Sequence, residues 1–76
     1  MTEIEKGEYV LNFIELHYDN TGTAVIININ KIISYERLPG RSYTDLLLER
    51  EGMTVQETPA EISQLIVAAQ KTDKAS

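Results

Sequence analysis

The sequence contains no cysteine and a single histidine, so two common ways of stabilising a very small domain are missing. Without cysteines no disulfide can form, and one histidine cannot supply the ligands of a structural zinc site. A chain of 76 residues forms one domain at most and buries only about 60% of the surface that its unfolded form exposes. We therefore expect a single domain over residues 1–76, with flexible tails at 1–8 and 72–76, that gains buried area by self-association.

Long hydrophobic runs are also missing. No apolar stretch approaches the roughly 20 residues that a membrane-spanning helix needs. The chain begins with the acidic and polar segment MTEIEK, which lacks the basic start and apolar core of a signal peptide. These features predict a soluble, cytoplasmic protein that makes no contact with a membrane.

Basic residues are few. Twelve acidic side chains outnumber seven basic ones, which gives a net charge of −5. A protein that binds nucleic acid through phosphates concentrates lysine and arginine on one face, whereas the basic residues here are scattered. This balance disfavours a nucleic-acid partner, although one or two arginines could still bind a small anion.

Motifs for catalysis, metals and cofactors are missing as well. The glycines lie singly in expected turns instead of forming a phosphate-binding loop. His17 is expected on a strand, with a surface or structural role and no nucleophile near it in the sequence. Glu49 and Glu51 are expected to face solvent. We therefore predict no catalytic residue, no metal, no cofactor and no enzymatic activity.

Five segments have the pattern of β-strands. In the first, Ile14, Leu16 and Tyr18 alternate with Phe13, Glu15 and His17, which is the period of two expected of a half-buried strand. The second is so rich in β-branched residues that we expect it to be covered on both sides, or on one side plus a partner. Turn signals separate the segments. They span residues 13–18, 24–29, 32–38, 44–50 and 53–57.

The segment from Thr58 predicts a helix over residues 59–71. Thr58 is a candidate N-cap, Pro59 suits the first helical position, and Glu61 completes a capping box. Behind this start, four apolar residues recur at helical spacing and form one stripe, which would pack on the sheet. These residues are Ile62, Leu65, Ile66 and Ala69. The predicted fold class is therefore α+β, a small antiparallel sheet or open barrel of four or five strands with one C-terminal helix.

One cluster of side chains has the composition of a contact surface. Tyr35 and Arg37 lie on one face of the third strand, and the following loop brings Arg41 and Tyr43. Arginine offers paired donors to a carboxylate or phosphate, and tyrosine offers a ring for stacking. The four residues are our candidate ligand- or partner-binding site. The alternative is that Tyr35 belongs to the core and the arginines balance local acids.

Four segments within residues 13–67 follow a recognisable order. They are residues 13–16, the Asn28-x-x-x-Ile32 segment, residues 46–48 and the Val-x-Glu-Thr-x-x-Glu-Ile box at 55–62. This order resembles that of small bacterial and phage proteins typified by the flagellar FlbD family. The resemblance implies a short, non-enzymatic bacterial or phage protein. Residues 32–36 are also similar to part of the LytTR DNA-binding domain.

Our first functional hypothesis is a non-enzymatic interaction module, oligomeric, that docks on a protein partner through an exposed strand edge or the arginine–tyrosine loop. The apolar strand 24–29 is the candidate edge. A phage-type protein that binds or sequesters a small anion or nucleotide is the second hypothesis. A nucleic-acid-binding regulator is the third, and an enzyme comes last.

Overall fold

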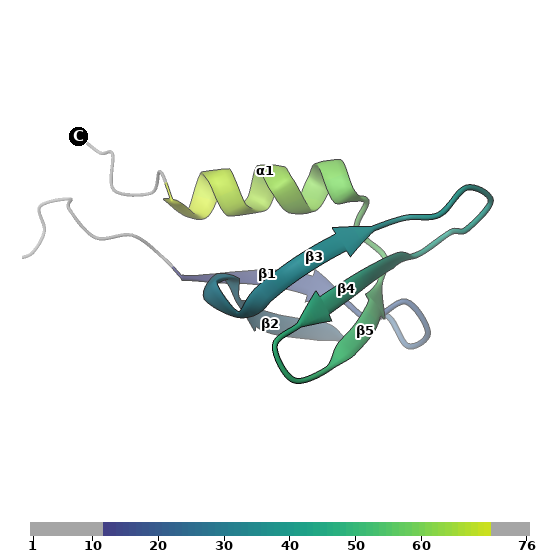
Figure 1. Ribbon diagram of the computed structural model, residues 1–76, viewed down its shortest axis with the longest axis horizontal. Helices are drawn as coiled ribbons and strands as arrows, with labels where there is room; N and C mark the ends of the chain where they lie inside the picture. Colours follow the sequence, from purple (N-terminus) through teal and green to yellow (C-terminus); the bar gives the residue numbers. More distant parts are fainter. Residues whose placement is uncertain (1–11, 71–76) are drawn as a thin grey trace, which may run out of the picture.

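The computed structural model describes residues 12–70, which form five strands, one 3-10 turn and one helix (Figure 1). In chain order these are β1 (Phe13–His17), β2 (Ala24–Asn28), η2 (Ile29–Lys31), β3 (Ile32–Glu36), β4 (Thr44–Leu48), β5 (Gly52–Val55) and α1 (Pro59–Gln70). The predicted α+β class, with antiparallel strands and one C-terminal helix, is confirmed. The expected tails at 1–8 and 72–76 and the helical position Lys71 lie outside the described residues.

The strands divide into two sheets rather than the single sheet that the sequence suggested. β1 and β2 form an antiparallel hairpin, and β3, β4 and β5 form an antiparallel meander in that order. One isolated bridge, between Tyr18 and Val55, joins the two sheets. Two backbone hydrogen bonds flank it, from Asp19 N–H to the Thr54 carbonyl and from Gln56 N–H to the His17 carbonyl. The sheets are thus joined along one seam, and the strands of residues 12–70 do not close into a barrel.

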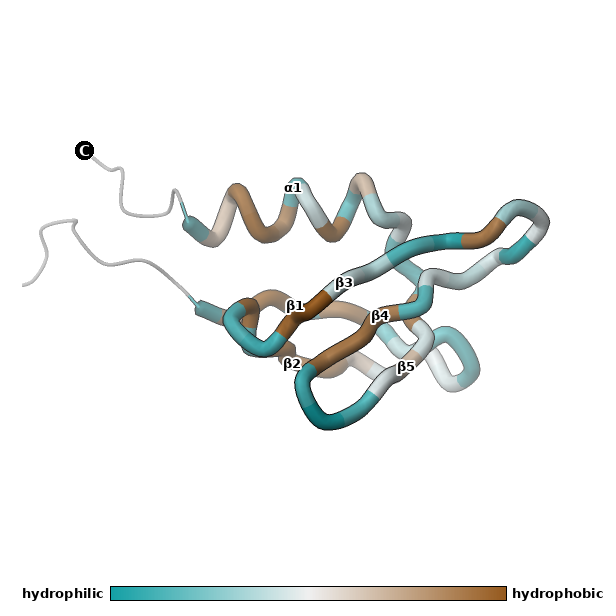
Figure 2. The backbone as a smooth tube through the Cα atoms, viewed as in Figure 1, coloured by the Kyte–Doolittle hydropathy of each residue, from teal (hydrophilic) through white to brown (hydrophobic). Residues whose placement is uncertain are grey.

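Alternation along the strands places the core between the two sheets and α1. In β4, Leu46 and Leu48 are buried while Asp45 and Leu47 are exposed, which is the period of two of a half-buried strand. Figure 2 shows hydrophobic positions concentrated on the strands and α1, whereas the turns after β1 and β4 are hydrophilic. The buried apolar residues are Ile14, Leu16, Ile27, Leu46, Leu48, Val55, Ile62 and Ala69.

A β-bulge in β3 changes which side chains face outward. Ile32 pairs with Leu48 but Ser34 pairs with Leu47, so one extra residue is inserted between them. A bulge breaks the alternation locally and re-aims a side chain. Ile33 and Ser34 are consequently both exposed, and Ile33 keeps 60% of its surface accessible.

The start of α1 is as predicted. Thr58 N–H donates to Glu61 Oε1 at 2.9 Å, and Glu61 N–H donates to Thr58 Oγ1 at 3.1 Å, which completes the capping box. The apolar stripe is narrower than expected: Ile62 and Ala69 are buried, but Leu65 is 36% exposed. The stripe prediction was wrong for Leu65, because this side chain lines an open hollow along α1 that the strands do not fill. No described helix has the length and apolar character needed to cross a membrane.

Candidate functional site

The structure separates the four predicted site residues into two pairs. Tyr35 and Arg37 are partly buried and bonded within the domain. The Tyr35 hydroxyl lies 2.7 Å from Ser63 Oγ on α1. Arg37 Nε donates to Thr44 Oγ1 at 3.3 Å, and Arg37 Nη2 donates to the Gln56 carbonyl at 2.9 Å. These two side chains tie β3 to α1 and to the segment after β5.

Arg41 and Tyr43 lie on the β3–β4 loop, which projects away from the rest of the domain (Figure 1). Arg41 Nη1 donates to the Tyr43 hydroxyl, and the guanidinium carbon lies 5.6 Å from the centre of the Tyr43 ring. A cation over an aromatic ring is stabilised by the ring quadrupole. Arg41 and Tyr43 therefore contact each other on the projecting loop.

A polar network that the sequence did not predict joins β1, β4 and the β5–α1 connection. Glu57 Oε2 lies 2.7 Å from His17 Nδ1, and Glu57 Oε1 accepts from the His17 backbone N–H at 3.0 Å. Thr44, which is fully buried, donates from Oγ1 to the Glu57 carbonyl at 2.6 Å. Glu15 Oε2 lies 3.4 Å from His17 Nε2. The network therefore holds the chain immediately before α1 against the end of β1.

The geometry of this network is that of a structural contact between β1 and the segment before α1. Each ring nitrogen of His17 faces a carboxylate, Glu57 on one side and Glu15 on the other, so neither nitrogen is aimed at a hydroxyl or thiol. The two carboxylates lie on opposite sides of the ring and do not converge on one point. Among residues 12–70, no three histidine, aspartate or glutamate side chains are placed to hold a metal ion.

The two partners shift each other's pKa. The hydrogen bond to Glu57 raises the pKa of His17 above its usual 6.5, against a smaller opposing effect of burial. Burial by itself would raise the pKa of Glu57, but the hydrogen bonds from the His17 ring and backbone outweigh it and lower that pKa below 4.5. Both shifts favour the charged pair in the folded state.

We expect this pair to make stability depend on pH. Because the folded-state pKa of His17 is raised, its contribution is complete below pH 6.5 and is lost as the pH rises through the raised value. Because the pKa of Glu57 is lowered, its contribution is present above pH 4.5 and is lost as the pH falls through the lowered value. The pair therefore stabilises the fold most between pH 4.5 and pH 6.5, where both contributions are complete. The free energy of unfolding in urea, measured across pH 5–8, should fall less with rising pH in His17→Gln than in the wild type. Parallel curves for the two proteins would mean that the His17–Glu57 pair does not stabilise the fold.

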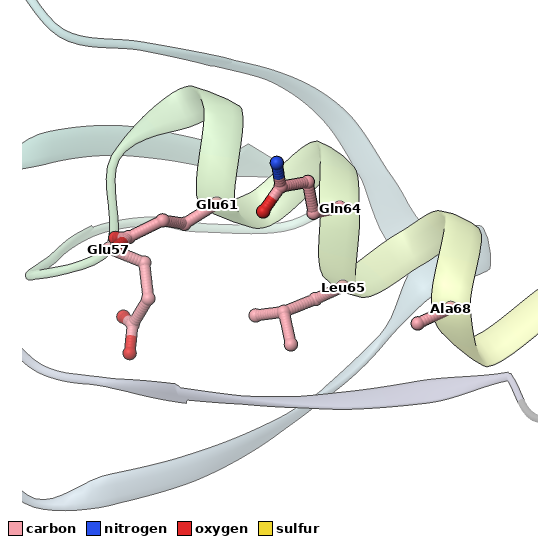
Figure 3. Close-up of a pocket in the computed structure, with 5 residues that line it drawn as sticks. All are labelled: Glu57, Glu61, Gln64, Leu65 and Ala68. Carbon is pink, nitrogen blue, oxygen red and sulfur yellow. The ribbon is translucent and has the colours of Figure 1, made fainter.

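A shallow hollow of about 460 Å³ lies beside this network, along α1. Figure 3 shows Leu65 and the Glu57 carboxylate pointing into the space between α1 and β1, while Glu61 lies at the start of the helix. Gln64 and Ala68 complete the lining. Glu57 is already bonded to His17, and Glu61 to the Thr58 backbone. Both carboxylates of this hollow therefore already accept hydrogen bonds within the fold.

The free edge of β2 is an unused hydrogen-bonding surface on the described sheets. In the β1–β2 pairing, Tyr18 N–H donates to the Thr23 carbonyl and Ile29 N–H donates to the Asn12 carbonyl. Hydrogen-bonded pairs alternate along an antiparallel ladder, so the β2 backbone groups that face β1 belong to Val25 and Ile27. The groups of Ala24, Ile26 and Asn28 face the other way. We call these three residues the β2 edge.

Within residues 12–70, no second strand pairs with the β2 edge, because β2 is paired only with β1. Asn28 is also the N-cap of η2, so its carbonyl begins that turn. Its side chains lie on the outer face of the hairpin, and Ile26 is 60% exposed. Phe13 of β1, diagonal to Ile26 across the hairpin, is 54% exposed. Of the two alternatives predicted for this strand, coverage on both sides was wrong, because only its Val25 and Ile27 face packs into the core. Coverage on one side plus a partner stays a prediction.

The fold and this edge define a class of protein: a small α+β domain that leaves one uncharged strand open. A scan against protein families, a search of curated proteins and a search of solved structures each return no match to this chain. The resemblance to the FlbD family and the similarity to LytTR domains stay predictions.

Proposed function

We propose that the protein is a non-enzymatic interaction module that binds a protein partner by adding a strand to the β2 edge. The observation that carries the proposal is the set of outward backbone groups at Ala24, Ile26 and Asn28 on a strand without any charged side chain. An extended segment that pairs with such an edge obtains main-chain hydrogen bonds, while its side chains meet those of the edge strand.

The β2 edge lacks the features that normally keep a strand edge from pairing. Proteins protect edges with lysine, proline, inward charges or bulges. The residues of β2 are AVIIN, with none of these. The free edge of β3, by contrast, carries a bulge after Ile32 and ends in Glu36. The contrast within one small domain favours β2 as the binding edge.

Anion binding receives less support from the same structure. Two donor groups of Arg37 already form hydrogen bonds, with the Thr44 hydroxyl and with the Gln56 carbonyl. Arg41 is left on the projecting loop with Tyr43 as its neighbour. A single exposed arginine without a second convergent donor is a weak site for a phosphate or nucleotide.

The test compares two variants of the full chain as immobilised bait. Ile26→Lys places a charge on the β2 edge, and Leu47→Lys places the same charge on the outer face of the other sheet, where Leu47 is 46% exposed. We expect a genuine partner to bind at least about tenfold more weakly, or about 1.4 kcal/mol, to Ile26→Lys, and equally well to Leu47→Lys.

A retained protein counts as a partner only when, added in purified form, it slows hydrogen exchange of the backbone amides of Ala24, Ile26 and Asn28. The proposal would be overturned if the partner slowed hydrogen exchange only at amides outside the β2 edge and bound Ile26→Lys as tightly as the wild type. Binding lost equally in both lysine variants would assign the effect to charge alone and would also overturn it.

A further inference from the structure

We infer that the occupant of the β2 edge is a second copy of this chain, paired antiparallel about a two-fold axis at Ile26. The inference rests on the proposed function, since it names the partner of the same edge. It is carried by the self-complementary pattern of the edge, in hydrogen bonding and in charge.

The hydrogen-bonding pattern of the edge is symmetric about its central residue. A two-fold axis at Ile26 sets Ile26 opposite Ile26 of the second copy, and Ala24 opposite Asn28 at both ends. All three residues direct their N–H groups to the free edge, because Val25 and Ile27 bond to β1. The carbonyls of Ala24 and Ile26 face the same way, whereas Asn28 is the N-cap of η2 and its carbonyl begins that turn. The Ile26 pair can therefore exchange two hydrogen bonds and each Ala24–Asn28 pair one, from Asn28 N–H to the Ala24 carbonyl, so that the two hairpins become one continuous four-stranded sheet. If the pairing register were shifted by one residue, the outward groups of one copy would lie opposite Val25 or Ile27 of the other, whose backbone groups point to β1.

The side chains of the edge fit the same arrangement. The two Ile26 side chains, each 60% exposed in the single chain, would lie next to each other on the outer face and bury apolar area. No charge repels another across the pair, because β2 contains no ionisable residue. This matters in a protein of net charge −5, whose copies repel each other elsewhere.

The interface is small, so we expect a dimer in rapid exchange with a Kd in the range of about 1–100 µM. Sedimentation of the full chain from about 1 to about 500 µM, which brackets this range, should show a monomer–dimer equilibrium. Ile26→Lys should weaken dimerisation at least about tenfold, whereas Leu47→Lys should leave it unchanged apart from a small effect of charge.

The absence of cysteine permits a direct test of the axis. An Ile26→Cys variant has one thiol, and the dimer sets it opposite its copy at a Cα separation of about 5.5 Å, within the range of disulfides. At about 10 µM protein, an effective concentration in the millimolar range and the Kd range above predict oxidation to the linked dimer about ten- to a hundredfold faster than for Leu47→Cys. Equal rates for the two variants would overturn the two-fold arrangement.

The outcomes separate this inference from the proposed function. A wild type that stays monomeric throughout, or a dimer that Ile26→Lys does not weaken, overturns pairing between copies. The proposed function then survives only if a different protein protects the amides of Ala24, Ile26 and Asn28. If neither a second copy nor another protein protects them, both fail.

Discussion

Replacing Ile62 with aspartate is expected to unfold the protein. Ile62 is fully buried in the same cluster as Leu16 of β1 and Val55 of β5. The variant loses aliphatic packing and places a carboxylate where water cannot reach it, which together cost about 5 kcal/mol or more. Native proteins are stable by about 5–15 kcal/mol, or about 0.05–0.15 kcal/mol per residue, so a domain this small lies at the low end. Far-UV circular dichroism and the thermal transition would report the loss.

The matched control for this substitution is Val67→Asp on the same helix. Val67 is 48% exposed, so its replacement should change the free energy of unfolding by about 1 kcal/mol or less. Val67→Asp should keep a cooperative transition near that of the wild type. A cooperative transition for Ile62→Asp within a few degrees of the wild type would contradict the docking of α1 on the strands.

Replacing Thr44 with valine is expected to cost about 2 kcal/mol although the two side chains have nearly the same shape. The Thr44 hydroxyl donates to the Glu57 carbonyl and accepts from Arg37 Nε inside the domain. Valine keeps the packing but removes the partner of the part-buried Glu57 carbonyl and of the Arg37 Nε–H group. The free energy of unfolding in urea measures the effect.

Thr44→Ser is the control, because it keeps the hydroxyl and removes one methyl group. It should cost about 1 kcal/mol, less than Thr44→Val. The reverse order, with valine equal to or more stable than serine, would mean that the hydroxyl contributes nothing and that Thr44 acts only by filling space.

The sequence predicted the elements well because their signals are local. The alternation in β1 and β4 and the capping box of Thr58 and Glu61 each depend on residues a few positions apart. The strand ends were less accurate: β3 stops at Glu36, two residues before its expected end. The bulge near Ile33 left no local signal, because it depends on the register with β4.

The candidate site was predicted less completely. His17 and Glu57 are forty positions apart, so no spacing rule could pair them; the only hint was that each is a polar residue at the end of a strand-like segment. Tyr35, Arg37, Arg41 and Tyr43 are close in sequence, yet the first two bond inward and the last two lie on a projecting loop.

The sequence by itself determined the class of fold, the order of its strands and the start of its helix, because hydrophobic period, turn residues and caps act over a few residues. Tertiary structure alone decided how the strands divide into two sheets, which carboxylate meets His17, and which strand is left open. Those outcomes depend on pairing between distant segments. Only one edge of β2 is paired with another strand within the described chain. The functional proposals rest on its other edge.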